Sequence, residues 1–196
     1  MAFGRRTALR GAAVFAAGAA VPGRAGAGTR ELTWELHSTH IGGVGPLRSR
    51  IVSGVPEVVR YGEPVVFGPV IVQLVGKDLL GGMARAAGYD AVSAKVTAHV
   101  VVTDARQLSG RLPVAVEFPR TVVPDERAEL VLTGTATLAE PASGPRNAGP
   151  MTVAATSGAA GVLTLYRTGS GAATPLGFEA GLASDQDPLL ATLEVR

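Results

Sequence analysis

The sequence predicts an all-β protein, an antiparallel immunoglobulin-like β-sandwich with one short helix. Three observations predict it. Apolar and polar residues alternate with period two in several runs, Gly- and Pro-containing turn signals separate the runs, and about nine or ten such runs occur. Each alternating run is expected to form a strand with one buried and one solvated face, as in an antiparallel sheet. A barrel is the alternative, because short strands at this spacing fit either architecture.

The expected strands differ in how strongly the pattern supports them. Alternation is clearest at 32–36, 92–102 and 130–138, whereas 69–75 and 112–118 are uniformly apolar and read as central strands. Trp34, the single tryptophan, lies on the first run and suits a core aromatic. Weaker candidates are 47–52, 151–156, 162–167, 177–181 and 189–195.

One helix is expected at 77–87, where Leu79, Leu80, Met83 and Ala87 share a stripe. Gly81 and Gly82 in its middle cost about 2 kcal/mol relative to alanines, so the helix should be short or broken. Residues 140–150 are rich in Pro, Gly, Ser and Asn and are expected to form a mobile loop. Turn signals are expected at Gly42-Gly43, Gly62-Glu63-Pro64, Ser109-Gly110, Pro124-Asp125, Gly169-Ser170-Gly171 and Asp187-Pro188.

Residues 1–27 have the composition of an export signal. Arg5 and Arg6 precede a weakly apolar run at 11–21, and Ala25-Gly26-Ala27 offers a small-residue cleavage site. The run is too short to span a bilayer. Its weak hydrophobicity behind an arginine pair favours a twin-arginine signal over ordinary secretion, which remains the alternative. The mature chain, 28–196, is therefore expected to be secreted as one domain.

Charge and cysteine content exclude several classes. Four of the 18 basic residues and none of the 16 acidic residues lie in 1–27, so the mature chain carries 14 basic and 16 acidic groups, a net charge of −2. No basic patch with interleaved aromatics remains for nucleic acid. The chain has no cysteine, which excludes disulfides, thiolate metal sites, a cysteine nucleophile and a lipid anchor on cysteine.

The histidines give a weak metal signal. His37 and His40 form an H-x-x-H motif, but the odd spacing on a strand sends the two side chains to opposite faces. They would converge on a metal only if the chain turned at Ser38-Thr39, and surface histidines are the favoured interpretation. His99 lies on the polar face of its run and is expected to be solvated.

No other constellation assigns catalytic chemistry. The sequence lacks a G-x-S-x-G nucleophile motif. By spacing alone, Glu117 and Glu129 could be the pair of carboxylates that a glycosidase uses. Asp185 and Asp187 could do the same, or bind calcium together with Gln186, but they are expected to flank a turn. The aromatic candidates for carbohydrate binding, which more simply cover the ends of the fold, are Tyr61, Tyr89 and Tyr166.

Three stretches carry a family resemblance: 32–47, with Leu32-Thr33-Trp34-Glu35-Leu36 and Gly45-Pro46-Leu47; 55–64, with Val55-Pro56 and Gly62-Glu63-Pro64; and 181–193, with Ser184-Asp185-Gln186-Asp187. Together they resemble a secreted β-sandwich domain of unknown function found in high-GC Gram-positive bacteria. The resemblance implies a fold and a location outside the cytoplasm, and it contributes no catalytic residue.

The sequence thus predicts an exported, non-catalytic β-sandwich module with a binding or structural role at the cell envelope. Its partner would be an envelope protein or polysaccharide of unknown identity, with no nucleic acid, no cofactor, no metal and no membrane span after signal removal. The alternative is a secreted hydrolase using scattered carboxylates or histidines.

Overall fold

The computed structural model describes residues 28–38, 42–65, 67, 70–76, 79–124, 129–138, 144–167, 169 and 171–196. The export signal expected at 1–27 lies outside the described residues. The described elements, in chain order, are β1 (Gly28–Ser38), β2 (Gly42–Ser53), β3 (Val58–Val59), β4 (Val70–Gly76), α1 (Leu79–Ala86), β5 (Ala91–Thr103), β6 (Ser109–Val122), β7 (Leu130–Leu138), β8 (Gly149–Tyr166), β9 (Ala173–Leu182) and β10 (Leu189–Val195).

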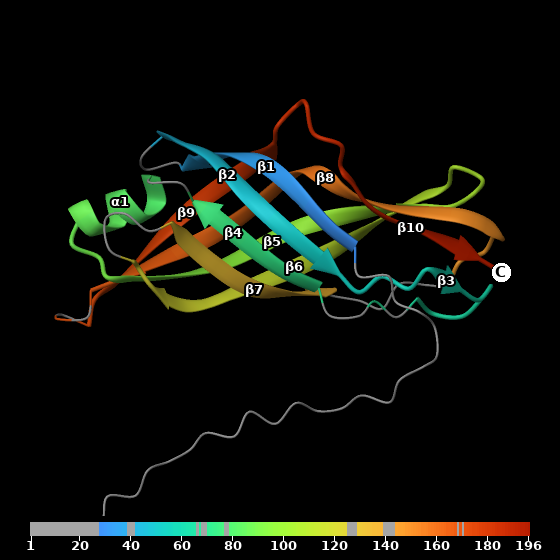
Figure 1. Ribbon diagram of the computed structural model, residues 1–196, viewed down its shortest axis with the longest axis horizontal. Helices are drawn as coiled ribbons and strands as arrows, with labels where there is room; N and C mark the ends of the chain where they lie inside the picture. The colour runs from blue at the N-terminus through green and yellow to red at the C-terminus, as the bar shows by residue number, and fades with distance from the viewer. Residues whose placement is uncertain are drawn as a thin grey trace, which may run out of the picture.

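The strands form a closed barrel (Figure 1). Eight strands follow one another in the order β8, β5, β6, β7, β4, β2, β1, β9, and β9 pairs with β8 to close the ring. Every pair in this ring is antiparallel. Over its described residues the chain is all-β with one short helix, as expected, but the prediction of an immunoglobulin-like sandwich is wrong.

The long strand β8 explains the difference. Its first part, 149–154, pairs with β10, and its later part, 158–166, pairs with β9. The sequence pattern predicted two strands here, at 151–156 and 162–167, because the residues between them are Ser, Gly and Ala. Because β8 is one continuous strand with two successive partners, β9 and β10 belong to the same sheet, whereas a sandwich would have two separate sheets. β10 and the short β3, which pairs with it in parallel, extend the sheet beyond the ring.

Alternation places the expected residues inside. Leu130, Leu132 and Gly134 on β7 are buried, and the residues between them are exposed. Leu32 and Leu36 on β1 are likewise buried, with Trp34 half-buried between them. The main core cluster gathers residues from β4 to β8, among them Val72, Val92, Phe118, Leu132 and Leu163.

A second cluster lies where β5, β6 and the first part of β8 extend past the ring. The buried residues come from β8, from β10 and from the segment around β3: Met151, Val153, Leu193, Val195, Val55 and Val65. Two half-buried residues of β5 and β6, Val102 and Leu112, pack against them. β10 and this segment therefore cover apolar surface that the ring leaves exposed.

Helix α1 falls inside the expected range and packs at one end of the barrel (Figure 1). Ala84 is buried in the main core, and the α-carbon of Gly81 faces Leu130. Arg85 donates a hydrogen bond to the carbonyl of Pro124, just after β6. The side chains of Leu79, Leu80 and Met83, expected on one stripe, lie outside the described residues, as do residues 77–78.

Several expected turns differ. Gly42-Gly43 and Ser109-Gly110 open β2 and β6, so they belong to strands. The turn at Gly62-Glu63-Pro64 and the irregular segment at Asp187-Pro188 are confirmed. Asp125, Ser170 and residues 140–143 of the expected mobile loop lie outside the described residues, and the end of that loop, 149–150, already belongs to β8.

Two glycines allow the barrel wall to pack closely against aromatic rings. A β-carbon on Gly161 would lie 2.4 Å from the carbonyl oxygen of Lys95 and 2.8 Å from Cζ of Phe178. A β-carbon on Gly134 would lie 2.6 Å from the carbonyl oxygen of Glu117 and 2.7 Å from Cδ1 of Phe118. In both places a phenylalanine of the neighbouring strand covers the glycine, a device that accommodates strong sheet curvature.

Gly161→Ala should lower the free energy of unfolding by about 1–3 kcal/mol, because the new methyl group overlaps backbone that cannot move easily. Gly177→Ala is the matched control, since Gly177 lies on the paired strand β9 and a β-carbon added there would meet nothing within 4 Å. Urea denaturation of both variants measures the difference. Equal stabilities would contradict the close approach at Gly161.

The β5–β6 hairpin depends on a carboxylate. Oδ1 of Asp104 accepts hydrogen bonds from the backbone N–H groups of Arg106 and Leu108, both at 2.9 Å, and Oδ2 accepts one from the Asn147 amide. The Asn147 bond, followed by the Leu108 bond, lowers the pKa of Asp104 below its ordinary value of 3.8. The ionised carboxylate therefore stabilises this turn and connects it to the segment before β8.

Because the folded pKa of Asp104 lies below its unfolded value, its contribution to stability is present above about pH 4 and is lost as the pH falls through the folded pKa. Asp104→Asn should therefore have a lower melting temperature than wild type at pH 7, and the difference between the two melting temperatures should become smaller in acid. Thermal melts of both proteins at pH 7 and near pH 2.5 test this. A gap that stays constant would contradict the role of the charge.

Candidate functional site

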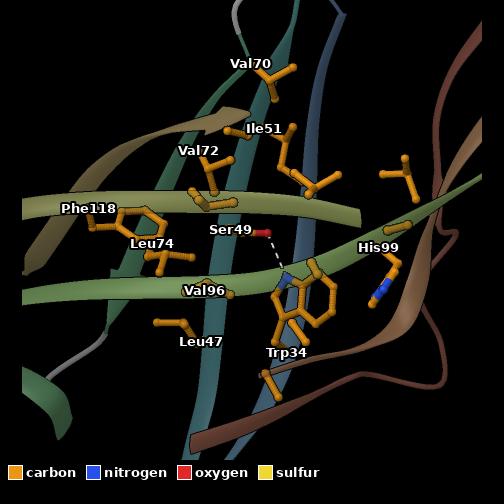
Figure 2. A pocket seen from close by; sticks show the side chains of 18 of the residues that line it. Trp34, Leu47, Ser49, Ile51, Val70, Val72, Leu74, Val96, His99 and Phe118 are labelled. Carbon is orange, nitrogen blue, oxygen red and sulfur yellow. Dashed lines mark hydrogen bonds between the residues drawn. The ribbon is translucent and has the colours of Figure 1, made fainter. Parts of the chain in front are cut away.

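The barrel encloses an apolar cavity of about 130 Å³ (Figure 2). Its wall comes from strands all around the ring: Trp34 of β1, Leu47 of β2, Val72 of β4, Val96 of β5 and Phe118 of β6 all line it. Among the described residues that line the cavity, only Ser49 and His99 are polar. The interior is therefore suited to a molecule held by shape and burial of apolar surface.

Alanines account for the space. Five of them line the cavity, on four strands: Ala98, Ala136, Ala155, Ala159 and Ala180. An eight-stranded barrel has an interior just wide enough for ordinary side chains to fill or for one small ligand. Small side chains at inward positions leave space inside the barrel that a ligand can occupy. The cavity is close in size to an engineered apolar cavity of about 150 Å³ that stays dry and binds benzene.

The polar groups of Trp34 and Ser49 satisfy each other. The indole Nε1 donates a 2.8 Å hydrogen bond to Oγ of Ser49, drawn as the dashed line in Figure 2, and that hydroxyl donates at 3.4 Å to the carbonyl of Leu32. Ser49 is 3% exposed. Since both donors have partners inside the wall, the indole presents an apolar surface to the cavity.

A second hollow lies on the outer face of the barrel, over β5, β8 and β9. His37, His99, Arg111 and Glu179 line it, together with small and hydroxyl-bearing residues of β8. The strand ladder is irregular here, because Ala98 pairs with Ala159 whereas Val100 pairs with Ala155. In the ladder between β5 and β8, residues 156–158 and His99 are therefore unpaired, although His99 lies opposite Pro113 of β6 and Gly158 opposite Gly181 of β9. The Thr156 hydroxyl lies 3.1 Å from the His99 carbonyl and donates to it.

His99 differs from its expected solvated state. It is half-buried and lines both the outer hollow and the inner cavity, at whose edge it lies in Figure 2. Nη2 of Arg111 is 3.2 Å from its Nδ1. Because an arginine can only donate, Nδ1 accepts, and this hydrogen bond assigns the ring proton of neutral His99 to Nε2.

In the part of the chain that the structure describes, the H-x-x-H motif of His37 and His40 does not form a metal centre. His37 is exposed on β1, opposite Glu179 of β9, and His40 lies outside the described residues. Within the described ranges, no group of three His, Asp or Glu side chains is placed to hold a metal ion.

The candidate carboxylates have separate partners. Glu117 forms an ion pair with Lys95 at 3.0 Å and Glu129 with Arg48 at 3.6 Å. Asp187 accepts a hydrogen bond from the N–H of Leu189 at 3.0 Å, which confirms a turn role before β10. Asp185 accepts from the side chain of Gln186 at 3.2 Å. These contacts are structural, and none brings two of the carboxylates together.

The three tyrosines do not form one platform. Tyr61 is 60% exposed beside β3. Tyr89 and Tyr166 each carry an arginine over the ring, Arg167 at 4.7 Å and Arg120 at 4.4 Å from the ring centroids. Tyr89 also donates to Thr174, and Tyr166 is hydrogen-bonded to Ser93. These two rings stabilise the outer wall of the barrel.

Sequence reasoning missed both the cavity and the outer hollow. The available signal was the presence of alanine at inward positions of strongly alternating runs, such as Ala98 and Ala136, where larger residues would fill a core. The irregular pairing of β8 left no comparable mark in the sequence.

Comparison with protein families, with characterised proteins and with solved structures finds no match to this chain. None of the helices among the described residues is long and apolar enough to cross a membrane.

Proposed function

We propose that the mature protein is an exported, non-catalytic binding module that holds a small apolar molecule inside its barrel. The observation that carries this proposal is the cavity of about 130 Å³ with an almost entirely apolar lining. Apolar pockets of this kind bind by removing apolar surface from water, and the donors of Trp34 and Ser49 in the wall already have partners.

The alternative, a secreted hydrolase, would need an acid and a base converging on one reacting atom. The described carboxylates that could serve are held in separate contacts on the outside of the barrel. A ligand in the cavity would meet one ionisable side chain, His99. A binding role therefore has more support than hydrolysis.

Ligand binding can be measured through Trp34, the only tryptophan, because it lines the cavity. Toluene should change its emission and release heat on titration. Ala136→Leu should weaken toluene binding by about tenfold or more, because the larger side chain occupies the space the ligand needs. The matched control is Ala115→Leu on the adjacent strand β6, where Ala115 is exposed and absent from the cavity wall.

Circular dichroism and melting temperature confirm that both variants are folded. If wild type binds neither toluene nor other molecules of that size, and Ala136→Leu simply gains stability, the cavity is a packing defect and the proposal is wrong. Equal loss of binding in Ala136→Leu and Ala115→Leu would also contradict it.

The export part of the proposal rests on residues 1–27 and has its own test. The protein recovered outside the producing cells should begin at Gly28, as measured by intact mass. Replacing Arg5 and Arg6 together by Lys should leave the precursor inside the cell if the twin-arginine route is used. Unchanged export would identify ordinary secretion, and full-length protein confined to the cytoplasm would overturn export altogether.

A further inference from the structure

We propose that the outer hollow is a second binding site, which takes a short peptide with free termini. The carboxylate of the peptide binds Arg111 and His99, its ammonium group binds Glu179, and its chain lies across the outer face of the sheet between them. The ligand stays outside the barrel throughout, because all three side chains line the hollow. The inference goes beyond the apolar ligand proposed for the cavity and does not depend on it.

The hollow has room for a peptide, and its floor is made of small residues. Its volume is about 860 Å³, and Gly158, Ala160 and Gly181 line it. A β-carbon on Gly181 would meet nothing within 4 Å, and one on Gly158 would meet only the carbonyl oxygen of Ala180, at 3.8 Å. Glycine within a strand can mark a place where a ligand or another backbone approaches closely. The floor therefore allows an extended chain to lie against the sheet.

The side of the hollow formed by β5 and β6 carries donors for a carboxylate. Nη2 of Arg111 donates to Nδ1 of His99 at 3.2 Å, which leaves the other guanidinium N–H groups and the Nε2–H of His99 for a ligand. Among the described residues, no carboxylate forms an ion pair with Arg111. Because hydrogen bonds from a guanidinium to a carboxylate are charge-assisted and directional, this pair of side chains is suited to the C-terminus of a peptide.

The side of the hollow formed by β9 carries the opposite charge. Glu179 is exposed there and, over the described part of the chain, takes part in no ion pair. Glu35, also exposed, lies on the neighbouring β1 opposite Gly181. His37, the cross-strand partner of Glu179, is the other ionisable lining residue on this side. The two carboxylates give this side a negative potential, which is suited to the ammonium group at the N-terminus of a peptide.

The spacing between the two charged sides sets the length of the ligand. Thr97 of β5 lies opposite Ala160 of β8, which in turn lies opposite Glu179 of β9. Two strand spacings therefore separate β5 from β9, or about 10 Å. An extended chain covers about 3.3–3.6 Å per residue, so a tripeptide spans this distance and a single amino acid does not. Between the ends, the exposed residues Thr97 and Ser157 line the hollow with hydroxyls that can hydrogen-bond peptide groups.

The test compares trialanine with N-acetyl-trialanine and trialanine amide, each of which lacks one terminal charge. In calorimetric titrations, Arg111→Gln should weaken trialanine binding by about tenfold and leave binding of the amide unchanged, because only a free carboxylate uses the guanidinium. Glu179→Gln should weaken trialanine binding by about tenfold and leave binding of the acetylated peptide unchanged, because only a free ammonium group uses the carboxylate.

Two exposed residues outside the hollow supply matched controls. Arg120→Gln removes a guanidinium from the same strand, β6, where Arg120 stacks on Tyr166. Glu31→Gln removes an exposed carboxylate of β1 that does not line the hollow. Neither variant should change the binding of any of the three peptides.

A further pair of variants tests the floor of the hollow. Gly181→Val should weaken trialanine binding by about tenfold or more, because the new side chain occupies the space in which the peptide lies. Valine is well suited to a strand, and a β-carbon at this position meets nothing within 4 Å, so the fold should be retained. Gly177→Val is the matched control, since Gly177 is equally open on the same strand and does not line the hollow. It should bind trialanine as wild type does.

The possible failures have distinct meanings. If trialanine does not bind wild type, or if blocking either terminus leaves its affinity unchanged, the peptide assignment is overturned. Equal losses for trialanine and its amide in Arg111→Gln would also overturn it, since Arg111 would then support the shape of the hollow and not bind a carboxylate. Toluene binding in the barrel should be unchanged in Arg111→Gln and Glu179→Gln, so the proposed function stands or fails separately.

Discussion

Closure of the ring through β8 is the constraint on which the rest of the structure depends. One strand must pair with β10 over its first part and with β9 over its later part, while remaining bound to β5 along most of its length. The ladder to β5 breaks at 156–158, between the part of β8 that pairs with β10 and the part that pairs with β9, and such a bulge bends a strand locally. The interruption leaves His99 between the interior and the surface. The outer hollow thus lies where β8 passes from one partner to the other, and the ring that β8 closes surrounds the cavity.

Small residues serve two purposes in this design. Gly134 and Gly161 let neighbouring strands and phenylalanine rings approach more closely than a β-carbon would permit. The alanines on the inner face leave space that a tightly packed barrel would fill. The large apolar residues are concentrated in the main core cluster, where α1 also packs, and beneath β10 and β3. The main core cluster itself forms much of the cavity wall, since Val72 and Phe118 belong to both, so the large side chains supply stability around a space that the alanines leave open.

The sequence predicts the elements better than their assembly. Alternation identifies β1, β5 and β7 and the faces they bury, because one wet and one dry face leave the same period in any antiparallel sheet. That pattern is common to sandwiches and barrels, so it cannot identify which strands meet at closure. The closing contact begins with the Gly and Ala residues at 158–161, a stretch that the sequence pattern left as a gap between two strands. For His99, alternation predicted the outer face, but only the interrupted ladder brings that residue next to the cavity.

The order of pairing also bears on export. β1 pairs with β9, near the other end of the chain, and β9 pairs with β8, so the ring cannot close until the last barrel strand has been made. Such non-local pairing folds slowly compared with local structure. Residue 28 already belongs to β1, and residues 28–31 are exposed there, so the first described residues are not buried in the barrel. A cysteine-free barrel needs no oxidation to close. These features are compatible with the proposal that the protein folds before it is exported.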